Sequence, residues 1–517
     1  MKFRHHSFID INFDKVLLIS IYFSFFCCCY PYHSYSQVND NLSQKPNIII
    51  ILADDLGWDD VGYHGSTINT PNINTLVKEG IELDRFYVQP SCSPTRAALM
   101  TGKSPNRLGI TRSISKNQKV GLDLSEKLLP QYLNEIGYKS FMVGKWHLGG
   151  FITEYTPNAR GFEHFYGYLS GGIGYWDHNH GGGHDWQRNG STIREKGYAT
   201  TLLGNEAISL INNHNKQQPL LLYVAFGAPH LPNEAPDNQI KNYSHVTDPR
   251  RQIHSAMVAE LDNQVGRILN ALEQNNMDDK TLIFFTSDNG GQISEDPEFW
   301  SIAKKIVNVS SIFFDRPFPG KFLEQLASVY MDGGSSNTPL RGGKTSSLEG
   351  GVRVPAAIWW PNNFEPRKHE GFMTISDVLP TLLDAVGSKK NIPAEIDGAS
   401  QLKYLSNQEK QRIPDYLVTG FDNTALYQPP WKLITGNKIA LYNIYLDPSE
   451  SKNLASVYPN RVSAMQKIIN RWPTGKERGA TISQIIFDMD TWGGEEDRIP
   501  WAEAAKKNEE YIKKHAE

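Results

Sequence analysis

Four apolar runs that each end in a polar cluster constrain the fold of this chain more than any other feature. The clearest run, residues 47–53 (NIIIILA), is continuous and β-branched, which is typical of a strand buried on both faces of a parallel sheet. Asp54 and Asp55 follow it directly. The other runs and their clusters are 140–143 before Gly144-Lys145-Trp146-His147, 220–226 before Gly227-Ala228-Pro229-His230, and 282–286 before Ser287-Asp288-Asn289.

Helical patterns lie between these runs, at 95–101, 125–136, 200–212 and 249–274. Strands that alternate with helices indicate an α/β fold with a doubly wound, mostly parallel sheet flanked by helices. Ligands of such sheets bind at the carboxyl ends of the strands. We therefore expect the four polar clusters to meet in one site.

The character of the sequence changes twice after these runs. Residues 292–340 break the alternating pattern, with prolines at 297, 317 and 319 and the stretch Gly333-Gly334-Ser335-Ser336-Asn337, and predict a long excursion over the site. From about residue 412, short apolar runs predict antiparallel strands at 416–419, 431–435 and 439–446, then a helix at 461–471 and a charged tail at 502–517 that is helical or disordered. We expect a catalytic domain at 37–411 and a smaller C-terminal α+β subdomain at 412–517.

The amino-terminal segment predicts export. Its apolar stretch, 16–29, is short for a membrane span and follows basic residues, and Ser34-Tyr35-Ser36 fits a signal peptidase site, so residues 1–36 are interpreted as a signal peptide. The mature protein is then periplasmic or secreted. A lipid anchor on Cys27, Cys28 or Cys29 is less favoured, because Ser24-Phe25-Phe26 is bulky where small residues are expected. No later segment predicts a membrane span, and the net charge of -4 suggests no nucleic-acid partner.

The aspartates and the asparagine after the first and last runs offer only oxygen ligands. Asp54, Asp55, Asp288 and Asn289 suit a hard divalent cation, Ca²⁺ before Mg²⁺. An Asp-Asp pair after a strand is, by itself, also typical of a turn or a helix cap. Two such clusters on neighbouring strands favour a metal site.

Cys92 is the one cysteine that remains after removal of residues 1–36, so it has no disulfide partner within the chain. It opens a predicted helix in which Pro94 suits the first turn, and the amino end of a helix attracts an anion. A thiolate is a soft ligand and fits poorly beside a hard cation. Cys92 is either buried filler or a reactive centre whose sulfur is replaced in the working protein.

Four further side chains supply positive charge or a transferable proton. Lys145 and Lys344 suit the oxygens of a tetrahedral oxyanion, and His147 and His230 titrate near neutrality. Each of them alone is equally consistent with a solvated lysine or a structural histidine. Their positions after successive predicted strands favour a shared role.

Together these residues resemble a known family. Cys92-Ser93-Pro94-Thr95-Arg96, extended to Thr101-Gly102, is similar to the signature of the formylglycine-dependent sulfatases of the alkaline phosphatase superfamily. Two further segments resemble the arylsulfatase B branch of this family, namely Pro339-Leu340-Arg341-Gly342-Gly343-Lys344 and Glu349-Gly350-Gly351. The other matching motifs are Leu52-Ala53-Asp54-Asp55-Leu56-Gly57, Gly144-Lys145-Trp146-His147 and Ser287-Asp288-Asn289-Gly290-Gly291. The resemblance extends from about residue 46 to Asn453-Leu454.

The resemblance implies a modified nucleophile and one metal ion. A separate maturation enzyme would oxidise Cys92 to Cα-formylglycine, whose hydrated gem-diol attacks sulfur and then expels sulfate. One Ca²⁺ per chain would be held by the modified Cys92 together with Asp54, Asp55, Asp288 and Asn289.

The resemblance also assigns roles to the charged residues. Arg96 and His147 would orient the diol, Lys145 and Lys344 would bind sulfate oxygens, and His230 would protonate the departing alkoxide. The implied enzyme is an exported calcium-dependent sulfatase that is exo-acting on a sulfated glycan. An algal polysaccharide such as ulvan or carrageenan is favoured, because abundant Asn, Lys and Ile resemble a low-GC bacterium.

The substrate side is less constrained. Tyr175, Trp176, Trp186 and Trp300 suit either sugar stacking or loop packing, and His178, His180 and His184 have a spacing that would also suit a transition metal. Two alternative functions stay open. One is a phosphodiesterase or phosphonate hydrolase of the same superfamily, and the other is a non-catalytic binder of sulfated glycans in which Cys92 stays a thiol.

Overall fold

The computed structural model describes residues 45–115, 118–180, 183–293, 333–407, 414–480 and 499–515. The predicted signal peptide and most of the predicted excursion at 292–340, including Trp300, lie outside these ranges. Residues 45–517 group into one compact unit. The boundary between residues 411 and 412 stays a prediction.

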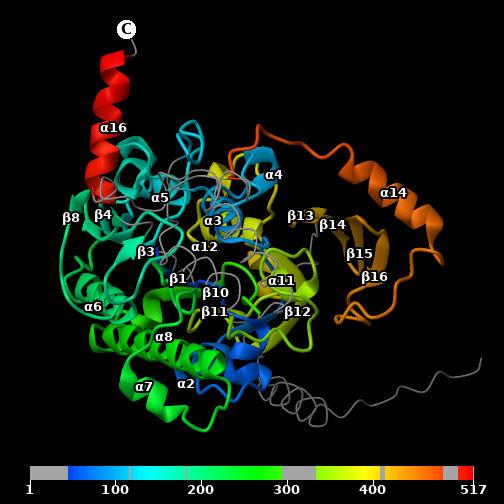
Figure 1. Ribbon diagram of the computed structural model, residues 1–517, viewed down its shortest axis with the longest axis horizontal. Helices are drawn as coiled ribbons and strands as arrows, with labels where there is room; N and C mark the ends of the chain where they lie inside the picture. The colour runs from blue at the N-terminus through cyan, green and yellow to red at the C-terminus, as the bar shows by residue number, and fades with distance from the viewer. Residues whose placement is uncertain are drawn as a thin grey trace, which may run out of the picture. The chain divides into compact units, whose positions relative to one another are not determined.

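A ten-stranded sheet forms the centre of this unit, in the order β12-β2-β11-β10-β1-β9-β3-β4-β7-β8 (Figure 1). Strands β10, β1, β9, β3 and β4 run parallel to one another, and the first four correspond to the predicted apolar runs, whereas β11 lies antiparallel between β10 and β2. The strands are β1 Asn47–Ala53, β2 Ile81–Tyr87, β3 Lys139–Lys145, β4 His164–Tyr168, β7 Gln187–Arg188, β8 Ser191–Thr192, β9 Leu220–Ala225, β10 Thr281–Ser287, β11 Ala356–Trp359 and β12 Arg367–Thr374. A separate ribbon joins β5 Asn179–His180 to β6 Gly183–His184.

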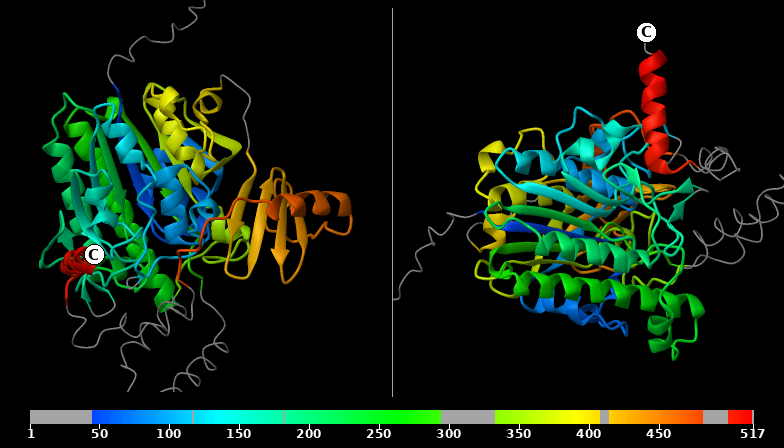
Figure 2. Two further views of the ribbon diagram at one scale, coloured as in Figure 1. Left: turned by 90° about the horizontal axis from the view of Figure 1, so that it is seen from above. Right: turned by 90° about the vertical axis from the view of Figure 1, so that its left-hand side faces the viewer.

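Helices cover both faces of the sheet, and the long helix α8 runs along one of them (Figure 2). Side chains of β1 alternate between two cores, because successive residues of a strand point to opposite faces. Ile50 packs in the core that contains Leu99 of α3, and Ile51 in the core that contains Leu261 of α8. The helices of this region are α2 Pro71–Lys78, α3 Cys92–Thr101, α4 Pro105–Leu108, α5 Leu129–Asn134, α6 Ala199–Asn212, α7 Asp237–Asn242, α8 Pro249–Gln274, α11 Glu349–Val352, α12 Val378–Ala385 and α13 Leu402–Leu405.

One of the predicted helices is shorter than expected. The pattern at 125–136 contains Pro130, and α5 begins only at Leu129. A proline fits the first turn of a helix, where its missing N–H is no loss, but not the interior. By contrast, α8 has the predicted bounds, 249–274.

A second, antiparallel sheet follows in the C-terminal part, in the order β13-β14-β15-β16. One face packs against the catalytic region, where Tyr427 lies in a core with Tyr87, and the other packs Leu433 against Met465. The elements are β13 Tyr416–Thr419, β14 Asn423–Gln428, β15 Trp431–Gly436, β16 Ala440–Asn443, α14 Pro459–Ile469 and α16 Trp501–His515. The predicted α+β character of this part is confirmed. Across the part of the chain that is described, no helix combines the length and apolarity needed to cross a bilayer.

Candidate active site

Four adjacent strands end at one level and bring the predicted polar clusters together. In the sheet, Ala53 pairs with Ser287, Leu52 pairs with Ala225, and Ala225 pairs with Gly144. The residues that follow these positions therefore leave the sheet at the same edge. This edge is where an open α/β sheet binds its ligand.

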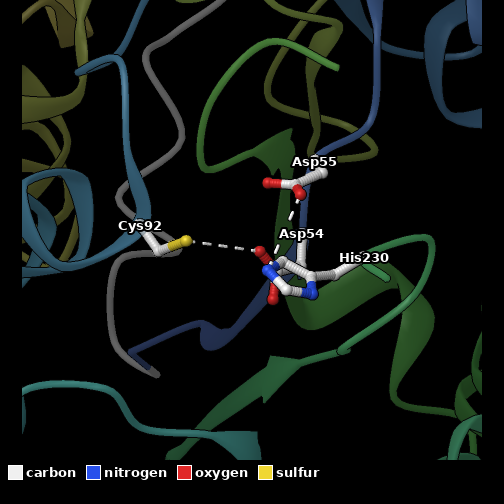
Figure 3. A group of neighbouring side chains, drawn as sticks. All are labelled: Asp54, Asp55, Cys92 and His230. Carbon is white, nitrogen blue, oxygen red and sulfur yellow. Dashed lines mark hydrogen bonds and ion pairs between the residues drawn. The ribbon is translucent and has the colours of Figure 1, made fainter. Parts of the chain in front are cut away.

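Helix α3 adds Cys92 to this edge. The Cys92 thiol donates a hydrogen bond to Asp54 Oδ1, with Sγ 3.6 Å from that oxygen. Ligand atoms of Asp54, Asp55, Cys92 and His230 all lie within 4.8 Å of one another (Figure 3). The cysteine predicted as a reactive centre and two of the predicted metal ligands thus form one cluster.

Buried arginine and lysine side chains neutralise the inner carboxylates. Arg96 is fully buried and donates two hydrogen bonds to Asp288 Oδ2, from Nε at 3.0 Å and from Nη2 at 2.7 Å. Lys145 Nζ donates to Asp54 Oδ2 at 2.5 Å. Arg96 also donates to the Lys145 carbonyl at 2.8 Å, which ties α3 to the end of β3.

Asp55 is surrounded by three of the other predicted site residues. Lys344 Nζ donates to Asp55 Oδ2 at 2.7 Å, Asn289 Nδ2 donates to Asp55 Oδ1 at 2.7 Å, and His230 Nε2 lies 3.7 Å from Oδ2. Asp55 has φ +66° and His147 has φ +58°, so both occupy the left-handed region. This backbone is uncommon for residues other than glycine and turns both side chains into the site.

The entrance of the site lies beside Lys344 and His230. Each of these side chains is 14% exposed, whereas those of Arg96, Lys145 and Asp54 are fully buried. Of these five side chains, only Lys344 and His230 are reached by solvent, so their side of the cluster is called its entrance.

The pKa values of the two neighbouring carboxylates, Asp54 and Asp55, are shifted in opposite directions. Burial, followed by the charge of Asp288, raises the pKa of Asp54 to about 7 in spite of Lys145. Burial would also raise the pKa of Asp55, but Lys344 and His230 outweigh it and lower that pKa. The ionised form of Asp54 is thus disfavoured mainly by burial, even with Lys145 beside it.

The thiol and the two histidines are neutral at pH 7. Burial raises the pKa of Cys92 to about 12, so the thiol keeps its proton, and a protonated thiol is a weak nucleophile. Burial, then Lys145, lowers the pKa of His147, and burial, then Lys344, lowers that of His230.

The hydrogen bonds of the histidine rings fix which nitrogen carries the proton. His147 Nε2 donates to the Ile114 carbonyl at 3.1 Å, and its Nδ1 is buried without a hydrogen-bond partner. His230 Nδ1 donates to the Leu231 carbonyl at 2.6 Å, which leaves Nε2 facing Asp55. Each ring thus presents one lone pair to the site.

The donor set fits a hard divalent cation. Asn289 Oδ1 is buried and has no hydrogen-bond partner, and it lies beside the carboxylate of Asp55, to which Nδ2 of the same amide donates. An unpartnered buried acceptor next to carboxylates is what an oxygen-coordinated cation satisfies. The raised pKa of Asp54 points the same way, because a bound cation would stabilise its ionised form.

One further site residue was missed by the sequence analysis. Asn337 Oδ1 accepts from the Gly291 N–H at 3.0 Å, while its Nδ2 donates to the carbonyls of Gly291 at 3.0 Å and Gly342 at 3.2 Å. Asn337 therefore holds the segment after Asn289 against the segment before Lys344. Its place in a serine- and glycine-rich stretch predicted only a loop, and no spacing signal marked it.

The histidine-rich loop is hydrogen-bonded rather than arranged around a metal. His178 Nε2 donates to the Gly197 carbonyl at 3.2 Å, and His184 bonds Asn179 Oδ1 at 3.1 Å and the Ile193 carbonyl at 2.7 Å. His180 packs its ring against Trp501 at 5.7 Å. These contacts favour the structural reading of the three histidines.

Comparisons with known proteins identify the family of this chain. The family model described as Sulfatase matches residues 46–388, well over half of the chain. Arylsulfatase J of Mus musculus is 29% identical over 496 residues, covering 83% of this chain and 76% of the relative. N-acetylgalactosamine-6-sulfatase of Homo sapiens is 31% identical over 400 residues, covering 73% of this chain and 69% of the relative.

A solved structure extends the agreement to the fold. The crystal structure of Ps i-CgsB in complex with k-i-k-neocarrahexaose is 29% identical, with a TM-score of 0.73, and covers 87% of this chain and 100% of that chain. The shared architecture is the alkaline-phosphatase-like α/β fold predicted from the sequence. The chain belongs to the sulfatase family and is a sulfuric ester hydrolase.

Proposed function

We propose that this sulfatase is an exported, calcium-dependent enzyme that removes sulfate groups from a sulfated polysaccharide or oligosaccharide by exo action, with a nucleophile made from Cys92. The observation that carries the proposal is the position of the Cys92 sulfur, 3.6 Å from Asp54 Oδ1 in a buried cluster of carboxylates and lysines. With a pKa of about 12, the thiol itself is no nucleophile at neutral pH. Oxidation of Cys92 to formylglycine by a maturation enzyme would replace the soft sulfur with oxygen.

The calcium ligands would be the residue at position 92 with Asp54, Asp55, Asp288 and Asn289. Bound calcium supplies positive charge that neutralises these carboxylates and polarises a sulfate oxygen. Arg96 holds Asp288 in place through two hydrogen bonds and is itself fully buried. This supports a positioning role for Arg96 towards the metal ligands, besides its proposed orientation of the nucleophile.

The remaining charged residues would bind the sulfate group and handle the leaving group. Lys145 and Lys344 would donate hydrogen bonds to sulfate oxygens, exchanging part of their contact with Asp54 and Asp55. His147 would orient the hydrated nucleophile through its unpartnered Nδ1. His230, at the entrance, has an unprotonated Nε2 in the free protein; this nitrogen would take up a proton from solvent when the anionic sulfate ester binds and would pass it to the departing alkoxide.

The names of the relatives support a proposal for the substrate class. Ps i-CgsB was crystallised with k-i-k-neocarrahexaose, and the human relative is named for N-acetylgalactosamine-6-sulfate. The sequence suggested either ulvan or carrageenan, and we propose a carrageenan-like sulfated polysaccharide ahead of ulvan. Export rests on the amino-terminal segment at 1–36.

Mass spectrometry of the mature protein tests the proposal. The tryptic peptide 86–96 should carry formylglycine at position 92. The Cys92→Ala variant cannot form formylglycine and should release no sulfate from 4-nitrophenyl sulfate, although the chain stays folded. An intact thiol in fully active protein, or activity in Cys92→Ala, would contradict it. Faster cleavage of bis(4-nitrophenyl) phosphate than of the sulfate ester would instead assign a phosphodiesterase.

A further inference from the structure

Trp176 differs from its aromatic neighbours in the loop 170–186. Tyr175 is 3% exposed and Trp186 1% exposed, and both belong to the core that covers one face of the sheet. Trp176 is 50% exposed. Of the sugar-stacking candidates that the structure describes, the burial of Tyr175 and Trp186 favours loop packing, and Trp176 alone keeps an accessible ring.

The loop that carries Trp176 is fixed to the segment that carries His230. The Tyr175 hydroxyl lies 2.8 Å from the Gly227 carbonyl and 2.7 Å from the His230 carbonyl, which share its single proton, and the Tyr175 N–H donates to Glu234 Oε2 at 2.7 Å. These contacts from one residue anchor the position next to Trp176. They leave this part of the loop little freedom relative to His230.

The Trp176 ring also rests on a fixed support. Its centroid lies 5.1 Å from that of Tyr198, at an interplanar angle of 52°. Tyr198 in turn stacks on Tyr175 at 5.2 Å and donates its hydroxyl proton to the Glu234 carbonyl at 2.8 Å. A large apolar side chain that is held in one orientation yet half exposed loses little conformational entropy when a ligand covers it.

The first residues of the same loop pack against the two histidines of the site, His147 and His230. A Cβ atom on Gly171 would lie 2.7 Å from the His147 ring, and one on Gly172 would lie 3.1 Å from the His230 ring. The chain therefore passes close by the entrance of the site before it reaches Trp176. The start of the loop thus lies against His230, the residue proposed to act on the leaving group.

We propose that Trp176 is a specificity-determining residue on which a pyranose ring of the substrate stacks, next to the sulfate-binding site. The proposal rests on the proposed function, in which the leaving group is a sugar. The C–H face of a pyranose is apolar and packs well on an indole ring, whereas the sulfate group itself makes no use of it. Trp176 then contributes to binding of the sugar and not to the chemistry at sulfur.

Binding measurements separate sugar recognition from anion binding. In a Cys92→Ala background, which prevents turnover, Trp176→Ala should raise the Kd for k-i-k-neocarrahexaose about tenfold, and Trp176→Phe by about twofold. With Cys92 intact, Trp176→Ala should leave the inhibition constant of inorganic sulfate against 4-nitrophenyl sulfate unchanged. Tyr458→Ala is the matched control, because this exposed tyrosine belongs to the C-terminal subdomain and should change neither constant.

Each result decides the proposal. An unchanged Kd in Trp176→Ala, no saturable binding of the hexasaccharide, or an equal loss of inorganic sulfate binding would overturn it. Turnover of 4-nitrophenyl sulfate by the unmutated protein reports separately on the proposed function. A protein that cleaves this ester but does not use Trp176 is still a sulfatase, with another sugar contact.

Discussion

The side-chain amide of Asn289 donates a hydrogen bond to Asp55 Oδ1 at 2.7 Å and leaves its own Oδ1 buried without a partner. A buried acceptor without a partner costs about 1–3 kcal/mol. The same contact also orients Asp55, whose other oxygen, Oδ2, accepts a hydrogen bond from Lys344. Asn289 thus orders one proposed calcium ligand while it keeps a second ligand atom available.

Replacing Asn289 should therefore weaken calcium binding. We expect Asn289→Ala to lose at least about tenfold in calcium affinity, because it removes one oxygen ligand and the support of Asp55. Isothermal titration of calcium into chelator-treated protein measures this. Asn289→Asp, which keeps an oxygen at this position, is the matched control and should bind more tightly than Asn289→Ala. Equal calcium affinity in the alanine variant and the unmutated protein would remove Asn289 from the ligand set.

His230→Ala should affect substrates according to their leaving groups. A sugar alkoxide is a poor leaving group and needs a proton, whereas 4-nitrophenolate does not. We expect kcat to fall about a hundredfold or more for a sulfated sugar and far less for 4-nitrophenyl sulfate. Equal losses on both substrates would show that His230 binds or positions the ester and donates no proton.

The buried lysine of the C-terminal sheet should be important for stability. Lys432 Nζ lies 3.0 Å from Glu349 Oε1 and 2.7 Å from Glu450 Oε1, and all three side chains are buried. Lys432→Met leaves two buried carboxylates without their cation and should cost about 3–5 kcal/mol. Urea unfolding measures the loss. Lys513→Met removes the exposed pair with Glu509 and should change the unfolding free energy by less than about 0.5 kcal/mol.

His369 should make the stability depend on pH. Burial, then Arg367, lowers the pKa of His369 from 6.5 to about 4, so the unfolded chain binds a proton that the folded chain does not. Stability is full above pH 6.5 and falls as the pH drops to about 4, by about 3 kcal/mol in total from this residue. His369→Gln should flatten this part of the profile in urea unfolding at a series of pH values. An unchanged slope would assign the pH dependence to other groups.

Local pattern was sufficient to predict the parts of the site that lie at strand ends. The run at 47–53 became β1 with the same bounds, and Asp54, Lys145, His230 and Asp288 meet where parallel strands finish. Apolar continuity and the geometry of parallel sheets determine both results, and both can be read from the sequence.

Long-range pairing was not predictable in the same way. Strand β11, at 356–359, enters antiparallel between β10 and β2, although these two strands are far apart in sequence. Nothing in four residues specifies such partners, because a short apolar run fits either direction. The sequence also did not predict that Trp186 is buried and Trp176 exposed. Their burial depends on tertiary contacts, of Trp186 with Tyr166 and Tyr168 and of Trp176 with Tyr198.

The left-handed backbone at Asp55 and His147 makes thermal stability and catalytic turnover conflicting requirements at these two positions. Each such residue costs of the order of 1–3 kcal/mol, which glycine would relieve. Glycine at either position would relieve this backbone cost, but it would also remove a side chain of the site, and at position 55 it would remove the ion pair with Lys344 and the hydrogen bond from Asn289. Thermal engineering of this sulfatase has to leave both positions untouched and gain its stability elsewhere.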